Sequence, residues 1–236
     1  MKQFILVVFL LVTLYTSAQE ARNVEFQVDL FNRHYWRGFV FGNSPAIEPQ
    51  VTLNLSRFSF NIWAAQTFND SYSEIDLIPS YTAGNYEISF LDYYNPVMGI
   101  ENRFFNFSKG ENRHSGEFMV AYNGEGKIPF RWMAATFLYG DRHQVTDNHM
   151  FSTFFEIRYP FTVAGAETEI SLGLSPWESF YSDRLALVHA GLSIKDQIHI
   201  GQGASIPLKF SLFSNPSTSE VWVIFSIGLK KETNHK

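Results

Sequence analysis

Residues 71–90 read SYSEIDLIPSYTAGNYEISF, and polar and apolar side chains alternate along both halves of this stretch. Glu74 and Asp76 share one face, Ile75 lies on the other, and the alternation resumes after the turn at residues 83–85. A period of two places successive side chains on opposite faces of a strand. The stretch therefore predicts a β-hairpin with one polar and one apolar face.

The same alternation recurs along the rest of the chain, and no helical period of useful length interrupts it. The runs that predict strands are residues 24–37, 46–55, 57–67, 72–82, 86–94, 115–122, 128–139, 149–159, 166–175, 184–195, 205–213 and 220–229. No linker or change of composition separates them. These runs therefore predict a single all-β domain of about twelve strands.

The apolar face of such strands packs either against a protein core, as in a soluble β-sandwich or a lipocalin-like binder, or against lipid. Runs of about ten residues suit tilted strands that cross a bilayer. Longer connections alternate with shorter ones along the chain, as in transmembrane barrels. Aromatic residues make up 17% of the sequence, and many lie near strand ends, where interfacial girdles form: Trp36, Phe68, Tyr72, Tyr94, Tyr122, Tyr139 and Tyr159. We therefore predict an all-β fold, a transmembrane antiparallel up-and-down β-barrel of about 12 strands.

The first residues resemble a targeting segment. Lys2 precedes an apolar stretch at residues 4–14, and Thr16-Ser17-Ala18 has the small residues of a cleavage site. A membrane-anchor helix is the alternative, but the apolar stretch is short for a bilayer span. We predict a cleaved signal peptide at 1–18 and a single outer-membrane β-barrel domain at 19–236, with a polar tail at 230–236 beyond the last strand.

Composition limits the classes of function. The chain has 18 basic and 23 acidic residues without a basic patch, so we expect no nucleic-acid partner. It has no cysteine, which excludes disulfides, thiol catalysis and cysteine-ligated zinc. Pro49 and Pro79 fall inside predicted strands and argue against the barrel, because proline removes a ladder hydrogen bond unless a β-bulge absorbs it.

Several motifs in the N-terminal half resemble a family of bacterial outer-membrane barrels that is labelled Gcw_chp. The resemblance covers about residues 24–96, and Pro79 departs from the usual strand pattern. It implies an outer-membrane location, but no established activity and no catalytic residue. The motifs are Tyr35-Trp36-Arg37-Gly38, Pro45-Ala46-Ile47-Glu48-Pro49-Gln50, Phe58-Ser59-Phe60-Asn61-Ile62-Trp63-Ala64, Glu74-Ile75-Asp76-Leu77 and Asp92-Tyr93-Tyr94-Asn95-Pro96.

Charged residues on the polar face are candidates for the lining of a pore. Like charges in a narrow passage focus a field that attracts cations. The alternative is a network of salt bridges that plugs a narrow barrel, because unpaired confined charges are costly. The candidate pore-lining residues are Glu25, Asp29, Arg33, Arg37, Glu48, Glu74, Asp76, Glu87, Glu117, Arg131, Glu156, Arg158, Glu167, Glu169 and Lys209.

The long connection at residues 95–114 holds Phe104, Phe105 and Phe107, which we take as a candidate gate loop that folds into the barrel or packs on its rim. Catalytic signals are weak. His114 and Ser115 are adjacent, so on a strand they point to opposite faces and do not form a nucleophile–base pair.

We therefore predict a passive pore for small solutes or ions in the outer membrane, embedded among outer-membrane lipids, with no cofactor, metal site or catalytic site. The chain also carries histidine and aspartate residues at 141–149, which we interpret as a polar loop. A closed barrel with a structural or loop-mediated role is the main alternative. A membrane lipid hydrolase or acyltransferase is a further one.

Overall fold

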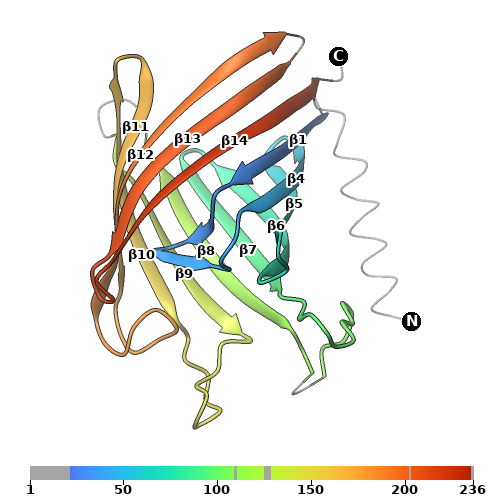
Figure 1. Cartoon of the computed structure of the whole chain (residues 1–236), viewed down its shortest axis with the longest axis vertical. Coiled ribbons are helices and arrows are strands. Elements are labelled where there is room, and N and C mark those ends of the chain that lie inside the picture. The colour runs from blue at the N-terminus through green and yellow to red at the C-terminus, as the bar shows by residue number, and fades with distance from the viewer. Residues whose placement is uncertain (1–21, 109–110, 125–128, 202, 235–236) are drawn as a thin grey trace.

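The computed structural model describes residues 22–108, 111–124, 129–201 and 203–234, so the predicted signal peptide lies outside the described residues. Among these residues, twelve antiparallel strands close into one barrel (Figure 1). Its strands are β1 (Arg22–Phe31), β4 (Ala46–Leu55), β5 (Phe58–Thr67), β6 (Ser73–Ala83), β7 (Tyr86–Tyr94), β8 (His114–Asn123), β9 (Arg131–Tyr139), β10 (Thr153–Val163), β11 (Ala166–Ser175), β12 (Ala186–Gly201), β13 (Ala204–Asn215) and β14 (Glu220–Asn234). Pairing of β1 with both β4 and β14 closes the sheet. The predicted all-β up-and-down barrel is confirmed.

The predicted first strand at 24–37 is wrong in its second half. β1 ends at Phe31, and the chain then turns into the lumen as a small separate hairpin of β2 (His34–Trp36) and β3 (Phe39–Phe41). Arg37 and Gly38 have φ angles of 49° and 88°, so both central residues of the turn are left-handed. Two-residue hairpin loops of type I′ have this feature. Alternation persists through β2, which is why the pattern alone does not reveal the break.

The predicted polar tail at 230–236 is also wrong, because β14 continues through Asn234. Lys230 pairs in register with Gln27 of β1, and its Nζ lies 2.9 Å from a carboxylate oxygen of Glu25. Similarly, β12 continues to Gly201 and β13 begins at Ala204. Most of residues 196–204, which the pattern left between two predicted strands, therefore belong to these strands. The polar residues near the ends of β12, β13 and β14 adopt strand conformation because a residue of an adjacent strand pairs with each of them.

The prolines inside strands do not cause β-bulges. The pairing of β4 with β5 keeps one register on both sides of Pro49, and the pairing of β6 with β7 does so around Pro79. Each proline interrupts the ladder with one neighbour only, which a strand tolerates when the rest of the ladder holds its register. The register shifts that the structure does contain lie beside glycines, at 116/117, 173/174 and 199/201.

The two ends of the barrel differ. We call the end with the strand connections at 56–57, 84–85, 164–165 and 202–203 the turn end, and it also holds the start of β1 and the end of β14 (Figure 1). We call the other end, with the connections at 32–45, 68–72, 95–113, 140–152, 176–185 and 216–219, the loop end. Four of these six connections are long, and a predominance of long connections at one end is typical of transmembrane barrels.

The outer face of the barrel is apolar and its inner face is polar. Phe26, Val28 and Leu30 of β1 are 47%, 40% and 45% exposed on the outside, while the residues between them are polar and point inward. Aromatic side chains gather near the turn end in neighbouring pairs: Phe58 with Tyr81, Tyr86 with Tyr122, and Phe130 with Tyr159. Such a band is expected at a membrane interface. Among the described residues no helix is long and apolar enough to cross a membrane.

Two of the aromatic residues assigned to interfacial girdles lie elsewhere. Trp36 belongs to the hairpin inside the lumen and packs against Tyr93 and Tyr181. Tyr72 stacks on His34, also inside. Their positions near strand ends suggested the membrane interface. In the structure Trp36 is part of the hairpin and Tyr72 contacts it, so both side chains lie in the lumen.

The outward face can be tested with one pair of variants. Ile62 of β5 is 44% exposed on the outside, and its neighbour Asn61 points into the lumen. We expect Ile62→Lys to lower the free energy of unfolding in bilayers by about 2–4 kcal/mol, because it places a charge in hydrocarbon. Asn61→Lys places the same charge in a polar lumen and should cost much less. Urea unfolding of both variants gives the comparison, and equal costs would contradict a lipid-facing Ile62.

Candidate functional site: a lumenal hairpin and an acidic cavity

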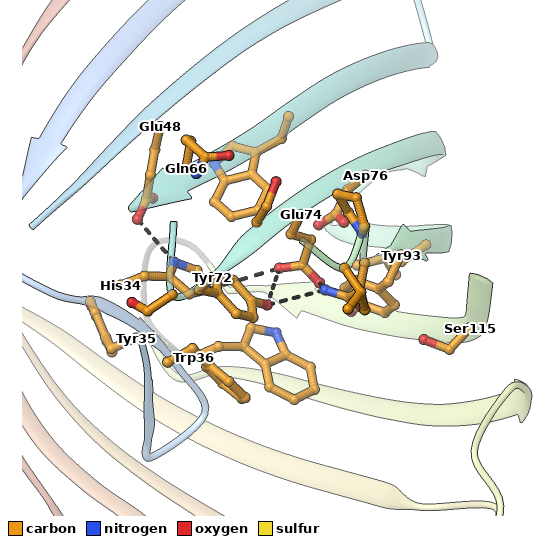
Figure 2. Close-up of a pocket in the computed structure, with 18 of the residues that line it drawn as sticks. His34, Tyr35, Trp36, Glu48, Gln66, Tyr72, Glu74, Asp76, Tyr93 and Ser115 are labelled. Carbon is orange, nitrogen blue, oxygen red and sulfur yellow. Dashed lines mark hydrogen bonds and ion pairs between the residues drawn. The ribbon is translucent and has the colours of Figure 1, made fainter. Parts of the chain in front are cut away.

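The hairpin of residues 34–41, which we call the lumenal hairpin, crosses the inside of the barrel and contacts opposite walls. At one wall, His34 Nδ1 lies 2.9 Å from Oε1 of Glu48 on β4 and Nε2 lies 3.9 Å from Oε2 of Glu74 on β6. The imidazole also stacks on Tyr72, with ring centroids 5.0 Å apart and planes 13° from parallel. Figure 2 shows this group of side chains around His34. The hairpin is thus tied to the β4–β6 wall.

Arg37 ties the turn of the hairpin to another wall. Its guanidinium donates to both oxygens of Glu117 on β8, at 2.5 and 2.7 Å, and to the Tyr181 hydroxyl at 2.6 Å. The Tyr93 hydroxyl donates to Glu117 at 2.8 Å. The Glu117 side chain is fully buried, and the guanidinium also lies 4.4 Å from the ring centroid of Trp36. Bidentate geometry and extra hydrogen bonds are what a buried ion pair needs to offset its desolvation.

Two further contacts fix the hairpin to β12 and β13. Tyr35 accepts a hydrogen bond from Lys209 of β13 and stacks on Phe213, with centroids 5.1 Å apart. A Cβ on Gly38 would lie 2.0 Å from the carbonyl oxygen of Val188 on β12. Only glycine permits this approach at a positive φ. The hairpin therefore spans the lumen from the β4–β6 wall to β12 and β13.

An apolar cluster inside the barrel supports these polar contacts. Trp36 and Phe39 of the hairpin pack against buried residues from β7, β9, β10, β12 and the loop after β11. The buried members are Leu91, Tyr93, Phe137, Phe154, Tyr181 and Val188. A barrel of this size has a wide lumen, and the hairpin supplies the side chains that fill one part of it.

Beside the hairpin lies a cavity of about 1330 Å³. Its lining runs from Val97 and Asn102 in the loop after β7 down to Asn61 and Ile78 on the inner face of β5 and β6. Five carboxylates line it, against two permanent cations, Arg37 and Lys209. The carboxylates are those of Glu48, Asp70, Glu74, Asp76 and Asp141. The cavity is thus open at the loop end and acidic along its wall.

Two neighbouring carboxylates of β6 differ in their partners. Glu74 accepts hydrogen bonds from the Tyr72 hydroxyl at 2.7 Å and from Asn95 Nδ2 at 3.1 Å. Asp76 is only 5% exposed, and its Oδ1 has no hydrogen-bond partner within the described part of the chain. An unpaired buried carboxylate is costly, so this position calls for a compensating group.

The residues proposed from sequence as pore-lining separate into two groups. Arg37, Glu48, Glu74, Asp76 and Lys209 line the cavity. The rest lie elsewhere, and several form ion pairs: Arg131 lies 3.6 Å from Glu167 and 3.4 Å from Glu169, Arg158 lies 3.1 Å from Glu156, and Glu25 pairs with Lys230. Two others accept hydrogen bonds, Asp29 from Gln27 and Glu87 from Ser89. Arg33 lies in the link between β1 and β2. An acidic cavity lining and a set of paired charges thus occur in different parts of one lumen, and the assignment of these residues to a pore stays a prediction.

The candidate gate loop does not bring its phenylalanines to the cavity lining. Phe105 and Phe107 are 86% and 60% exposed, while the Phe104 carbonyl lies 2.5 Å from His114 Nε2. The rings of Phe104 and Phe107 cover the imidazole of His114, with centroids 4.9 and 4.7 Å away. The part of this loop that does line the cavity is residues 95–99 and Asn102. Gating by the three phenylalanines stays a prediction.

The histidines can be checked against nucleophilic catalysis. Ser115 lines the cavity, whereas His114 bonds to Asp92 at 3.0 Å on the other face of β8, as strand alternation predicts. A serine–histidine contact does occur inside the barrel, between Ser171 and His189 Nε2 at 2.7 Å. The His189 Nδ1 has no partner, so the group that would orient a catalytic base is missing from this pair. Within the described ranges no group of three or more metal-ligating side chains comes together.

The lumenal hairpin, whose contacts position the residues of the site, was not predicted from sequence. The pattern instead placed Arg37 on a pore-lining strand and Trp36 at the membrane interface. One signal was present, because Arg37-Gly38 lies between two short aromatic runs and fits a two-residue turn. Nothing in the pattern shows that such a hairpin lies inside the barrel.

Comparison with known proteins gives similar solved structures but no family. No family profile and no curated protein matches the chain, so no specific family is identified. An outer membrane channel from Pseudomonas putida F1 is 13% identical over 90% of this chain and 94% of its own, with a TM-score of 0.40. The NanC porin is 8% identical over 86% of this chain and 98% of its own, with a TM-score of 0.46.

The Arg37–Glu117 pair can be tested by a double-mutant cycle. We expect Arg37→Met to lower the free energy of unfolding by about 3–5 kcal/mol, because it leaves Glu117 buried without its cationic partner. Adding Glu117→Gln should recover a large part of that loss. The measurement is urea unfolding in detergent.

Glu25→Gln is the matched control, since it breaks the partly exposed pair with Lys230 and should cost no more than about 1 kcal/mol. A cost of Arg37→Met as small as that of the control would show that the pair does not hold the hairpin in the lumen.

Proposed function

We propose that the protein is a narrow channel of the outer membrane for small solutes or ions, with a path that follows the cavity beside the lumenal hairpin. The observation that supports this proposal is the extent of the cavity, which reaches from the loop end to Asn61 and Ile78 along the inner wall of β5 and β6. Solutes would pass the hairpin on this side, because the opposite side is packed with the aromatic cluster.

The charge of the lining gives the channel a preference. Glu48, Glu74 and Asp76 lie on the cavity wall at the level of the hairpin, and Arg37, the nearest strong cation of the turn, is neutralised by Glu117. Carboxylates in a confined, poorly solvated passage attract cations and repel anions. We therefore expect the path to favour cations.

A second candidate function is a closed barrel that acts through its loops. The observation in its favour is that five strands of the barrel contact the hairpin: β4, β6, β8, β12 and β13. If the hairpin seals the lumen in every state, the cavity is a blind pocket at the loop end. A lipid-modifying enzyme has no comparable support, because His189 of the Ser171–His189 pair has no orienting acid among the described residues.

Current recordings in planar bilayers test the channel. We expect wild-type protein to give a small, cation-preferring conductance. Replacing residues 33–42 with a glycine–serine linker of equal length should raise the conductance severalfold, because the hairpin no longer occupies the lumen. Glu74→Gln should reduce the cation preference while leaving the conductance similar. Glu167→Gln, which removes a carboxylate that does not line the cavity, is the control.

The outcomes separate the two candidates, provided that each protein shows the heat-modifiable gel shift of a folded barrel. Current from the linker variant alone would favour the closed barrel, with the hairpin as a permanent plug. Absence of current from both proteins would refute the channel.

A further inference from the structure

We propose that the cavity beside the lumenal hairpin binds an organic cation, a protonated or quaternary ammonium group on an apolar or aromatic body, with Asp76 as its main counter-ion. The inference rests on the cavity that the proposed function treats as the permeation path, and it names the class of solute. Binding itself does not require that the cavity lead through the membrane.

The first argument is the state of Asp76. Its side chain is almost fully buried, it lines the cavity, and its Oδ1 has no partner within the described residues. Neither cation of the lining contacts Asp76, since Arg37 is paired with Glu117 and Lys209 donates to Tyr35 from β13, which is not adjacent to β6. Figure 2 shows Asp76 next to Glu74, on the side of Glu74 away from Glu48 and His34. A cationic ligand would supply the partner that the chain itself does not provide.

The second argument is the pair of rings on either side of Asp76. In the sheet, Asp76 is directly opposite Trp63 of β5 and Tyr93 of β7. Directly opposite residues have Cβ atoms about 5 Å apart, so the side chains of Trp63 and Tyr93 leave the inner face of the sheet on either side of Asp76. Trp36 of the hairpin packs on Tyr93 with centroids 5.9 Å apart and nearly perpendicular planes. The carboxylate thus lies among three aromatic side chains that all line the cavity.

This combination selects organic ammonium over other ligands. Ring faces attract a weakly hydrated cation, and the effect grows when water is excluded. An anion would meet the carboxylates of Glu48, Glu74 and Asp76, and Arg37, one of the two permanent cations of the lining, is already paired with Glu117. A metal ion is disfavoured, because no cluster of three ligating side chains occurs in the described part of the chain and indole rings are not metal ligands. A cavity of about 1330 Å³ has room for an ammonium group with an attached aromatic or apolar body.

Titration calorimetry on the folded protein in detergent tests the inference with three matched probes. The probes are phenethylamine, which is a cation at neutral pH, the neutral 2-phenylethanol and the anionic 3-phenylpropionate. We expect phenethylamine to bind about tenfold or more tightly than the alcohol, and the anion not to bind. Asp76→Asn keeps the shape of the side chain and should remove that preference. Glu167→Gln, in the same micelles, should retain it.

A second variant keeps the test decisive if Asp76→Asn does not fold. Trp63→Leu removes one flanking ring without changing charge, and we expect it to weaken phenethylamine binding severalfold more than binding of the alcohol. Equal affinity of the cation and the alcohol for wild-type protein would overturn the inference, as would an unchanged preference in folded Asp76→Asn.

Failure here is distinguishable from failure of the channel. Cation binding without current in bilayers would uphold the site and refute permeation. Current without a preference for phenethylamine would uphold the channel and refute this site.

Discussion

A guanidinium held inside a membrane-type barrel organises this structure. Arg37 donates to both oxygens of a fully buried Glu117, while the hydroxyls of Tyr93 and Tyr181 complete the hydrogen bonds around the pair. Removing either charge would leave the other buried among aromatic side chains without a partner of opposite charge. The pair therefore specifies where the hairpin turn lies, and the position of the turn determines where His34 and Trp36 contact the wall.

The need for such an insert follows from geometry. A closed barrel of twelve strands encloses more space than the side chains of its own inner face can fill. The connection between β1 and β4 supplies two short strands that occupy part of this space, and they divide the lumen into a packed side and an open side. The packed side is aromatic and holds the hairpin. The open side retains acidic and aromatic groups with a cavity between them.

Much of the barrel was predictable because of its strict two-residue period. Lipid on one side and a polar lumen on the other impose the same alternation on every strand, so most strand limits agree to within a few residues. The errors occur where pairing rather than pattern sets the limit. The residues after Leu229 look like a polar tail, but β1 is long enough to pair with them. Pro49 and Pro79 suggest bulges, but their strands hold register through the other contacts.

The sequence by itself determined the all-β class, the inward face of charges within the wall strands such as Glu74 and Asp76, and the opposite placement of His114 and Ser115, because alternation along a strand is a local property. It did not determine which charges meet. The pairing of Arg37 with Glu117 joins residues 80 positions apart, and Asp76 lies between Trp63 and Tyr93 only because three strands align in one register. The tertiary structure alone decided that residues 34–41 lie inside the barrel, since the same alternating aromatic run satisfies a strand in the wall and a hairpin in the lumen equally well.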